Sequence, residues 1–142
     1  MKKTKLIIKT KSKKYPIIFG SNIIKEVRNL LNSSNISFEK CFIIADTNVP
    51  KKQLDILKKK IKCKKKVIYN FKASEKNKNL KSINSILSKL FIFNFSRNDC
   101  IISFGGGITG DVAAFAASIY KRGINFINIP TTLLAQVDSS IG

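Results

Sequence analysis

The sequence predicts an α/β fold, in which a largely parallel sheet is flanked by helices and preceded by a short β-hairpin. Short apolar runs of strand length alternate with stretches whose apolar residues recur at helical spacing. The links between them are short, and a cluster of glycines follows one of the most apolar runs. At 142 residues, the chain is long enough to form one domain with a hydrophobic core.

In the first half of the chain, residues 5–9 and 15–19 are predicted to form two strands around a polar turn. Ser21 is a candidate N-cap for the helix that follows. The apolar side of that helix contains Ile23, Ile24, Val27, Leu30 and Leu31. Residues 41–45 (CFIIA) are continuously apolar, which indicates a strand buried on both faces.

In the remainder, Pro50 suits the first turn of a helix whose apolar side contains Leu54, Leu57 and Ile61. The predicted elements after it are a strand at 66–69, a polar loop at 72–79, a helix over 80–90, a strand at 100–104, a helix over 111–120, a strand at 124–129 and a helical turn within 131–138. This alternation is typical of βαβ units in one sheet.

The net charge of +19 is concentrated in the first 96 residues, which hold 24 basic and five acidic residues. The lysines are spread over every predicted helix and turn, so we predict loose attraction to polyanions and no specific nucleic-acid partner. No apolar run is long enough to cross a membrane, so no membrane partner is expected. The basic N-terminus lacks the apolar core of a signal peptide, and the three cysteines show no disulfide pattern, which predicts a cytoplasmic location.

The sequence contains no histidine, and its cysteines are far apart. A His-dependent catalytic triad or zinc site therefore cannot be built from these residues. We predict no metal site within the chain and assign no catalytic residue.

The glycine cluster Gly105–Gly107 follows the strand at 100–104, and Gly110 and Asp111 follow at the start of a helix. This order of strand, glycine turn and helix start lets backbone N–H groups approach a phosphate. The alternative is a tight turn packed beneath its neighbours, and Asp111 could simply interact favourably with the helix dipole. Gly105, Gly107 and Gly110 match the pattern G-x-G-x-x-G literally, but they do not follow the first strand, and no acidic residue ends a strand about 20 residues later. Asp111 stands where a P-loop requires lysine.

Polar side chains follow the ends of several predicted strands. They are Asp46, Asn48, Glu75, Thr131 and Thr132. In a parallel sheet these positions share the rim at which ligands bind, although turn formation, helix capping or solvation would also explain each of them. Arg122 suits bidentate phosphate binding, and Asp138 is expected to be buried or to face a site.

Three segments resemble 3-dehydroquinate synthases, the NAD-dependent enzymes of the shikimate pathway. They are GGGITGD (105–111), FAASIYKRG (115–123) and IPTTLLAQVDSSIG (129–142). Weaker similarity extends over the rest, including Asp46-Thr-Asn48 and a loop at 73–78 that resembles DGExxK. Ala73 and Ser74 replace the Asp and Gly of that loop, whereas Glu75 and Lys78 match it. The resemblance implies a Rossmann-like fold.

The resemblance also implies roles for individual residues. The NAD contacts would be Asp46, Asn48, Glu75, Lys78, Gly106, Gly107, Ile108, Asp111, Thr131 and Thr132. Arg122 would bind the phosphate of the substrate, and Asp138 would face its hydroxyls. The family converts the sugar phosphate 3-deoxy-D-arabino-heptulosonate 7-phosphate to 3-dehydroquinate and phosphate, uses zinc or cobalt, and forms homodimers.

Members of that family continue past this point with catalytic lysines and with a helical domain that supplies the metal ligands. We therefore expect residues 1–142 to form an incomplete N-terminal NAD-binding domain, without the helical metal-binding domain and inactive by itself. Two other hypotheses about the function of the chain stay open. One is a related sugar-phosphate cyclase or polyol dehydrogenase, and the other is a degenerate, non-catalytic fragment that binds polyanions loosely.

Overall fold

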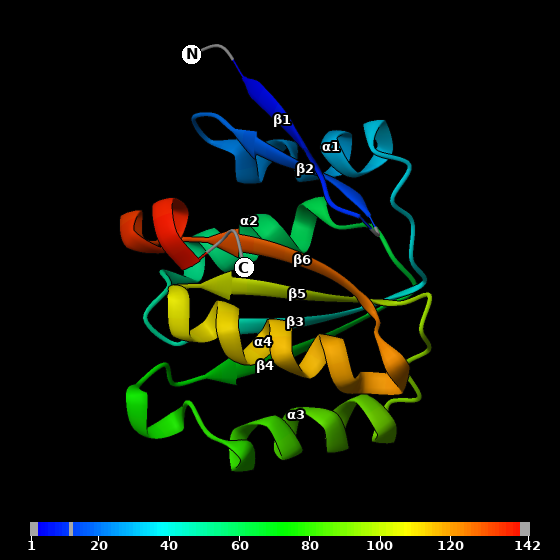
Figure 1. Cartoon of the computed structure of the whole chain (residues 1–142), viewed down its shortest axis with the longest axis vertical. Coiled ribbons are helices and arrows are strands. Elements are labelled where there is room, and N and C mark those ends of the chain that lie inside the picture. The colour runs from blue at the N-terminus through cyan, green and yellow to red at the C-terminus, as the bar shows by residue number, and fades with distance from the viewer. Residues whose placement is uncertain (1–2, 12, 140–142) are drawn as a thin grey trace.

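The computed structural model describes residues 3–11 and 13–139 and confirms the predicted α/β fold (Figure 1). Four parallel strands form one sheet in the order β4-β3-β5-β6. The strands are β3 (Lys40–Asp46), β4 (Lys65–Phe71), β5 (Cys100–Gly105) and β6 (Asn125–Pro130). Two further strands, β1 (Thr4–Lys9) and β2 (Lys14–Phe19), pair antiparallel as a separate hairpin.

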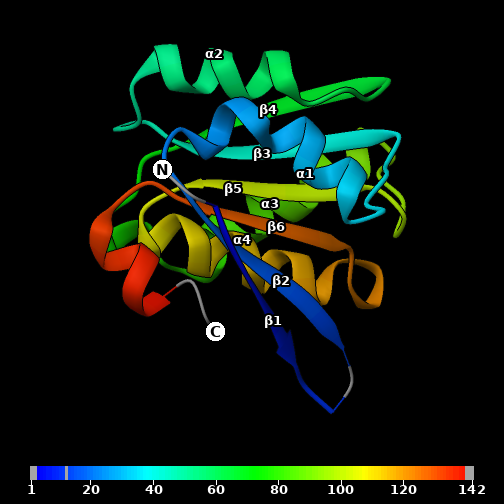
Figure 2. The ribbon, with the colours of Figure 1, turned by 90° about the horizontal axis from the view of Figure 1, so that it is seen from above.

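Helices cover both faces of the sheet (Figures 1 and 2). On one side, α3 (Leu80–Ile92) and α4 (Gly107–Ile119) pack on Phe42, Ile44 and Ile101. On the other side, α1 (Val27–Ser33) and α2 (Lys51–Lys60) cover Ile43 and Ile102. Successive residues of a strand point to opposite faces, so each central strand feeds two hydrophobic clusters.

The central strands β3 and β5 are almost completely buried, as their continuous apolar runs predict. The edge strands β4 and β6 are more exposed and contain more polar residues. Within the described residues, no helix combines the length and apolar character needed to cross a bilayer.

The helix of the glycine segment begins at Gly107, one turn earlier than the predicted start at residue 111. The N–H of Gly110 donates to the carbonyl of Gly106 at 3.0 Å, which is the first hydrogen bond of an α-helix. The low helix propensity of glycine hid this start in the sequence. Gly107 and Gly110 therefore belong to the first helical turn.

Other boundaries differ by smaller amounts. The segment after the hairpin opens as a 3₁₀ turn, Ile23–Glu26, and its N-cap is Asn22 in a left-handed conformation rather than Ser21. Pro50 is the N-cap of α2 rather than a residue of its first turn. The loop at 72–79 contains a 3₁₀ turn, Glu75–Asn77, and the final segment includes a π-helical turn, Ala135–Ser139.

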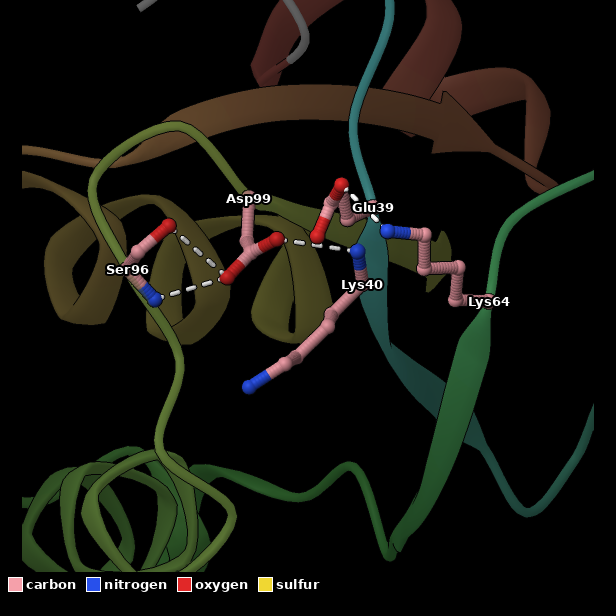
Figure 3. A network of polar contacts seen from close by, with 5 residues as sticks. All are labelled: Glu39, Lys40, Lys64, Ser96 and Asp99. Carbon is pink, nitrogen blue, oxygen red and sulfur yellow. Dashed lines mark hydrogen bonds and ion pairs between the residues drawn. The ribbon is translucent and has the colours of Figure 1, made fainter.

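The buried carboxylate of Asp99 joins the amino ends of β3 and β5 (Figure 3). Its Oδ1 accepts from the N–H of Lys40 at 2.9 Å, and its Oδ2 accepts from the N–H and the hydroxyl of Ser96 at 2.7 and 2.9 Å. A neighbouring pair, Glu39 and Lys64, lies 2.6 Å apart but is mostly exposed. The two interactions should therefore differ greatly in energy.

We expect Asp99→Ala to lower the free energy of unfolding by about 2–4 kcal/mol, because it removes a buried carboxylate and leaves the part-buried N–H groups of Lys40 and Ser96 without their charged acceptor. Glu39→Ala should change it by about 0.5 kcal/mol or less, because exposed ion pairs contribute little. Urea denaturation of both variants measures the difference. Equal losses would show that Asp99 does not join these strands.

Candidate functional site

The carboxyl ends of all four parallel strands meet at one rim of the sheet, on the left in Figure 1. The loops that leave this rim contain the polar residues singled out in the sequence. They are Asp46–Asn48 after β3, residues 73–78 after β4, the glycine turn after β5, and Thr131 and Thr132 after β6. The structure therefore gathers four separate sequence segments at the edge where parallel sheets bind ligands.

The glycine turn leads directly from β5 into α4. Gly105 ends the strand, and Gly106 is the N-cap with an extended backbone (φ −78°, ψ −172°). Among the described residues, a Cβ added at Gly106 would meet Thr132 alone, with Cγ2 at 3.4 Å and Oγ1 at 3.6 Å. Gly106 therefore leaves the backbone without a covering side chain at the N-terminus of a 13-residue helix. The N–H groups there have no acceptor within the helix, and together with the helix dipole they favour an anion.

Gly105 has a different role from Gly106. A Cβ at Gly105 would lie 2.7 Å from Cβ of Asp46 and 2.8 Å from Oγ1 of Thr109, which is too close for any side chain. This glycine therefore allows β3 and α4 to approach each other. For this one position, the packed-turn alternative is the correct explanation.

Asp46 is buried beside that contact. Its Oδ1 accepts from the N–H of Asn48 at 2.9 Å, and its Oδ2 accepts weakly from the hydroxyl of Thr109 at 3.5 Å. The carboxylate thus stabilises the loop that contains Asn48, which is the turn-forming role offered above as an alternative for Asp46. Thr109 is not among the residues predicted for the site, although its hydroxyl two residues after Gly107, at the start of an apolar helix, was the available signal.

An ion pair crosses the rim beside the glycine turn. Nζ of Lys78, from the β4–α3 loop, lies 2.8 Å from Oδ2 of Asp111, in the second turn of α4. Both side chains are more than two-fifths exposed, so the pair adds little stability. It does place a cation next to the helix N-terminus. The hydrogen bond to Asp111, followed by the charge of Asp111, raises the pKa of Lys78.

We expect Asp111→Asn to return the pKa of Lys78 towards its ordinary value. A raised pKa means that any stabilisation from the pair is complete below the ordinary lysine pKa of about 10.4. That stabilisation is lost as the pH rises through the pKa of folded Lys78, so it is constant near neutrality. An NMR titration of the Lys78 side chain measures this shift. An unchanged Lys78 pKa in Asp111→Asn would contradict the pairing.

The two threonines after β6 are held by local hydrogen bonds. The N–H of Thr131 donates to the carbonyl of Gly105 at 2.9 Å, and Oγ1 of Thr132 accepts from the N–H of Ala135 at 3.2 Å. The capping role foreseen for these residues is therefore present at Thr132. The same side chain lies against Gly106, so its hydroxyl also borders the glycine turn.

Asp138 lies on the rim side of the sheet, whereas Arg122 lies at the other end of α4. Asp138 is exposed in the turn that follows β6, on the side of the rim, rather than buried. Arg122 follows the last turn of α4, about 20 Å from the glycine turn by the length of a 13-residue helix. The structure therefore does not bring Arg122 to the rim of its own chain.

The described residues include no cluster of three or more potential metal-ligating side chains. Cys41 and Cys100 are buried partners on neighbouring strands, and Cys63 is half-buried. Burial raises the pKa of all three thiols, which keeps them protonated at neutral pH. The burial of Cys41 and Cys100 fits a packing role in the core.

The chain is similar to known proteins of one enzyme family along almost its whole length. A family model described as the N-terminal part of 3-dehydroquinate synthase matches residues 68–142. A 3-dehydroquinate synthase of Pelagibacter ubique (strain HTCC1062) is 54% identical over 138 residues, which cover 97% of this chain and 38% of that protein. The 3-dehydroquinate synthase of Clostridium acetobutylicum is 42% identical over 130 residues, covering 90% of this chain and 36% of that protein.

Among solved structures, 2-deoxy-scyllo-inosose synthase complexed with carbaglucose-6-phosphate, NAD⁺ and Co²⁺ superposes with a TM-score of 0.86 at 28% identity. The match covers 96% of this chain and 38% of that structure. The chain therefore spans less than two-fifths of the length of these relatives. The fold is shared along almost the whole of this chain.

Proposed function

Because this chain belongs to the 3-dehydroquinate synthase family, we propose that it forms the NAD-binding part of an enzyme that converts 3-deoxy-D-arabino-heptulosonate 7-phosphate to 3-dehydroquinate and phosphate. The observation that carries the proposal is the bare glycine turn at the start of α4, bordered by Lys78 and Thr132. Backbone donors and a cation at one point suit the pyrophosphate of NAD. The structural relative complexed with NAD⁺ gives further support.

In this proposal, the N–H groups of Gly106, Gly107 and Ile108 bind the pyrophosphate with help from Lys78. Asn48 donates or accepts hydrogen bonds at the ribose and adenine, and the Glu75 carboxylate accepts them, with Asp46 shaping their side of the rim. Asp111 keeps Lys78 in place and contacts the cofactor, and Thr131 and Thr132 bind its other end. When bound, NAD supplies transient oxidation of a ring hydroxyl of the substrate.

We also propose that Asp138 faces the substrate hydroxyls and that Arg122 binds the substrate phosphate. Asp138 lies on the rim side of the sheet, which supports its role. Arg122 lies at the other end of α4, so a phosphate must reach it from outside the NAD site of the same chain. In the homodimer expected of the family, the partner subunit would bring that phosphate to Arg122.

We further propose that residues 1–142 form one NAD-binding α/β unit and that the zinc or cobalt ligands of the family lie outside it. The sequence contains no histidine, a common ligand of zinc and cobalt, and this supports the division. Three large apolar side chains beside the rim, Leu133, Leu134 and Val137, are at least 66% exposed. Such a patch is typical of a surface that another part of a protein covers.

Titration of the ¹⁵N-labelled chain with NAD, followed by NMR, tests where the cofactor binds. We expect the amide signals of Gly106, Gly107 and Ile108 to shift saturably, together with those of Asn48 and Thr132. Amides at the opposite end of the sheet, such as Asn125, should not move. Shifts confined to the lysine-rich surface of α2 would instead favour loose polyanion binding by a non-catalytic fragment.

We propose that the chain alone does not catalyse the reaction. Incubation with the heptulosonate phosphate, NAD and Zn²⁺ or Co²⁺ should release no phosphate above the level without protein. Release that depends on the chain would contradict this proposal. Detection of another cyclised product in such an assay would favour a related sugar-phosphate cyclase.

A further inference from the structure

The turn after α4 contains three consecutive residues with a left-handed backbone. The φ angles are 48° at Lys121, 66° at Arg122 and 108° at Gly123. Glycine adopts such angles freely, but lysine and arginine do so only where other interactions compensate. The turn is closed by a 2.8 Å hydrogen bond from the N–H of Gly123 to the carbonyl of Tyr120. It lies at the end of the sheet opposite the glycine turn (Figure 1).

Two side chains anchor this turn to one carbonyl group. The buried hydroxyl of Tyr120 donates to the carbonyl of Phe95 at 2.8 Å and lies 3.2 Å from that of Leu90. Nζ of Lys121 donates to the same Phe95 carbonyl at 2.8 Å. Its ammonium also lies 5.5 Å from the centre of the Tyr120 ring, within range of a cation–π contact. Phe95 belongs to the link between α3 and β5.

Arg122 lies between Lys121 and Gly123, and in the described ranges its side chain has no such anchor. Its side chain is exposed, and within the described part of the chain no hydrogen bond or ion pair engages its guanidinium. The adjacent Lys121 donates to a carbonyl, so of these two side chains it is Arg122 whose charged group has no such partner among the described residues. A guanidinium offers a planar fork that matches two phosphate oxygens.

We propose that Tyr120 and Lys121 are positioning residues that fix the left-handed backbone of Arg122 and so hold its guanidinium ready for a phosphate group. The inference rests on the proposed function, which supplies a phosphate-bearing substrate. Loss of either anchor lets the turn relax towards right-handed angles, which redirects the Arg122 side chain. Binding must then restore the turn, so part of the phosphate affinity is lost.

The test uses inorganic phosphate as the probe and the Arg122 Nε–Hε NMR signal as the readout, at constant ionic strength. In the parent chain this signal should shift saturably. Lys121→Met keeps the aliphatic stem but removes the anchor, and we expect it to raise the apparent dissociation constant about three- to tenfold. Tyr120→Phe should act in the same direction, and Lys121→Arg, which can still donate to Phe95, should restore most of the affinity.

The matched control is Lys89→Met, which removes the same charge from α3, where the ammonium lies 5.9 Å from the centre of the Tyr69 ring. It should leave the phosphate affinity nearly unchanged. Equal affinity in Lys121→Met and the parent, or no shift of the Arg122 signal, would overturn the proposal. So would a mobile Arg122 amide in the unaltered chain, with an order parameter below about 0.6. NAD affinity should be the same in all these variants, so failure at the NAD site is a separate result.

Discussion

Gly105→Ala is expected to lower the free energy of unfolding by about 2–3 kcal/mol, because overpacking of a well-ordered contact has costs of this size. The new Cβ would lie 2.7 Å from Cβ of Asp46 and within 2.9 Å of two atoms of Thr109. Neither residue can move away easily, since Asp46 ends the buried strand β3 and Thr109 is buried in α4. Either the strand or the helix must shift, and both border the proposed cofactor site.

The matched control is the same substitution at Gly20. There the new Cβ would meet the flexible side chains of Lys3 and Ile23 at 3.4 and 3.6 Å, which are ordinary contact distances. Gly20→Ala should therefore change the free energy of unfolding by less than about 1 kcal/mol. Alanine also lowers the conformational entropy of the unfolded chain, which favours the folded state. Urea denaturation followed by circular dichroism compares the two. If both variants unfold at the urea concentration of the parent, β3 and α4 do not approach as closely as described.

Gly106→Val is expected to weaken NAD binding at least tenfold, about 1.4 kcal/mol, while the fold is retained. The backbone of Gly106 is extended, a conformation that valine readily adopts, and the first added carbon would meet Thr132 at an ordinary distance. The remaining methyl groups would cover the N–H groups at the start of α4. A pyrophosphate could then no longer reach them.

Calorimetric titration of parent and variant measures this effect, and a thermal denaturation curve confirms that the variant is folded. Ser118→Val introduces the same side chain near the other end of α4 and should leave NAD affinity unchanged. Equal NAD affinity in Gly106→Val and the parent would remove the glycine turn from the proposed site.

The fold could largely be predicted from the sequence because its strands have distinct patterns. Residues 41–45 and 100–104 are continuously apolar, and both proved to be central strands buried on two faces. The helix start at Gly107 could not be predicted, because tertiary contacts rather than helix propensity place glycines in its first turn. The N-cap at Asn22 was missed for a similar reason, since its left-handed backbone is a property of the turn.

The site was predicted in part. Strand ends identified the rim, because carboxyl ends of parallel strands must lie together. Close approach could not be seen in the sequence, so the packing role of Gly105 and its partner Thr109 emerged only from the structure. The position of Arg122 was equally hidden. Its role was implied by resemblance, and only the path of α4 shows that it lies at the opposite end of the sheet.

If this chain binds NAD at the glycine turn, a calorimetric titration of the unaltered chain with NAD will measure that binding. We predict one site per chain with a dissociation constant on the order of micromolar, about 8 kcal/mol of binding free energy. Binding should persist in 0.5 M NaCl, because backbone donors and shape contribute to it, whereas loose attraction of polyanions to the lysine-rich surface is screened at about that salt concentration. No saturable heat at NAD concentrations up to about 1 mM, or heat that disappears in the high-salt buffer, would contradict the account.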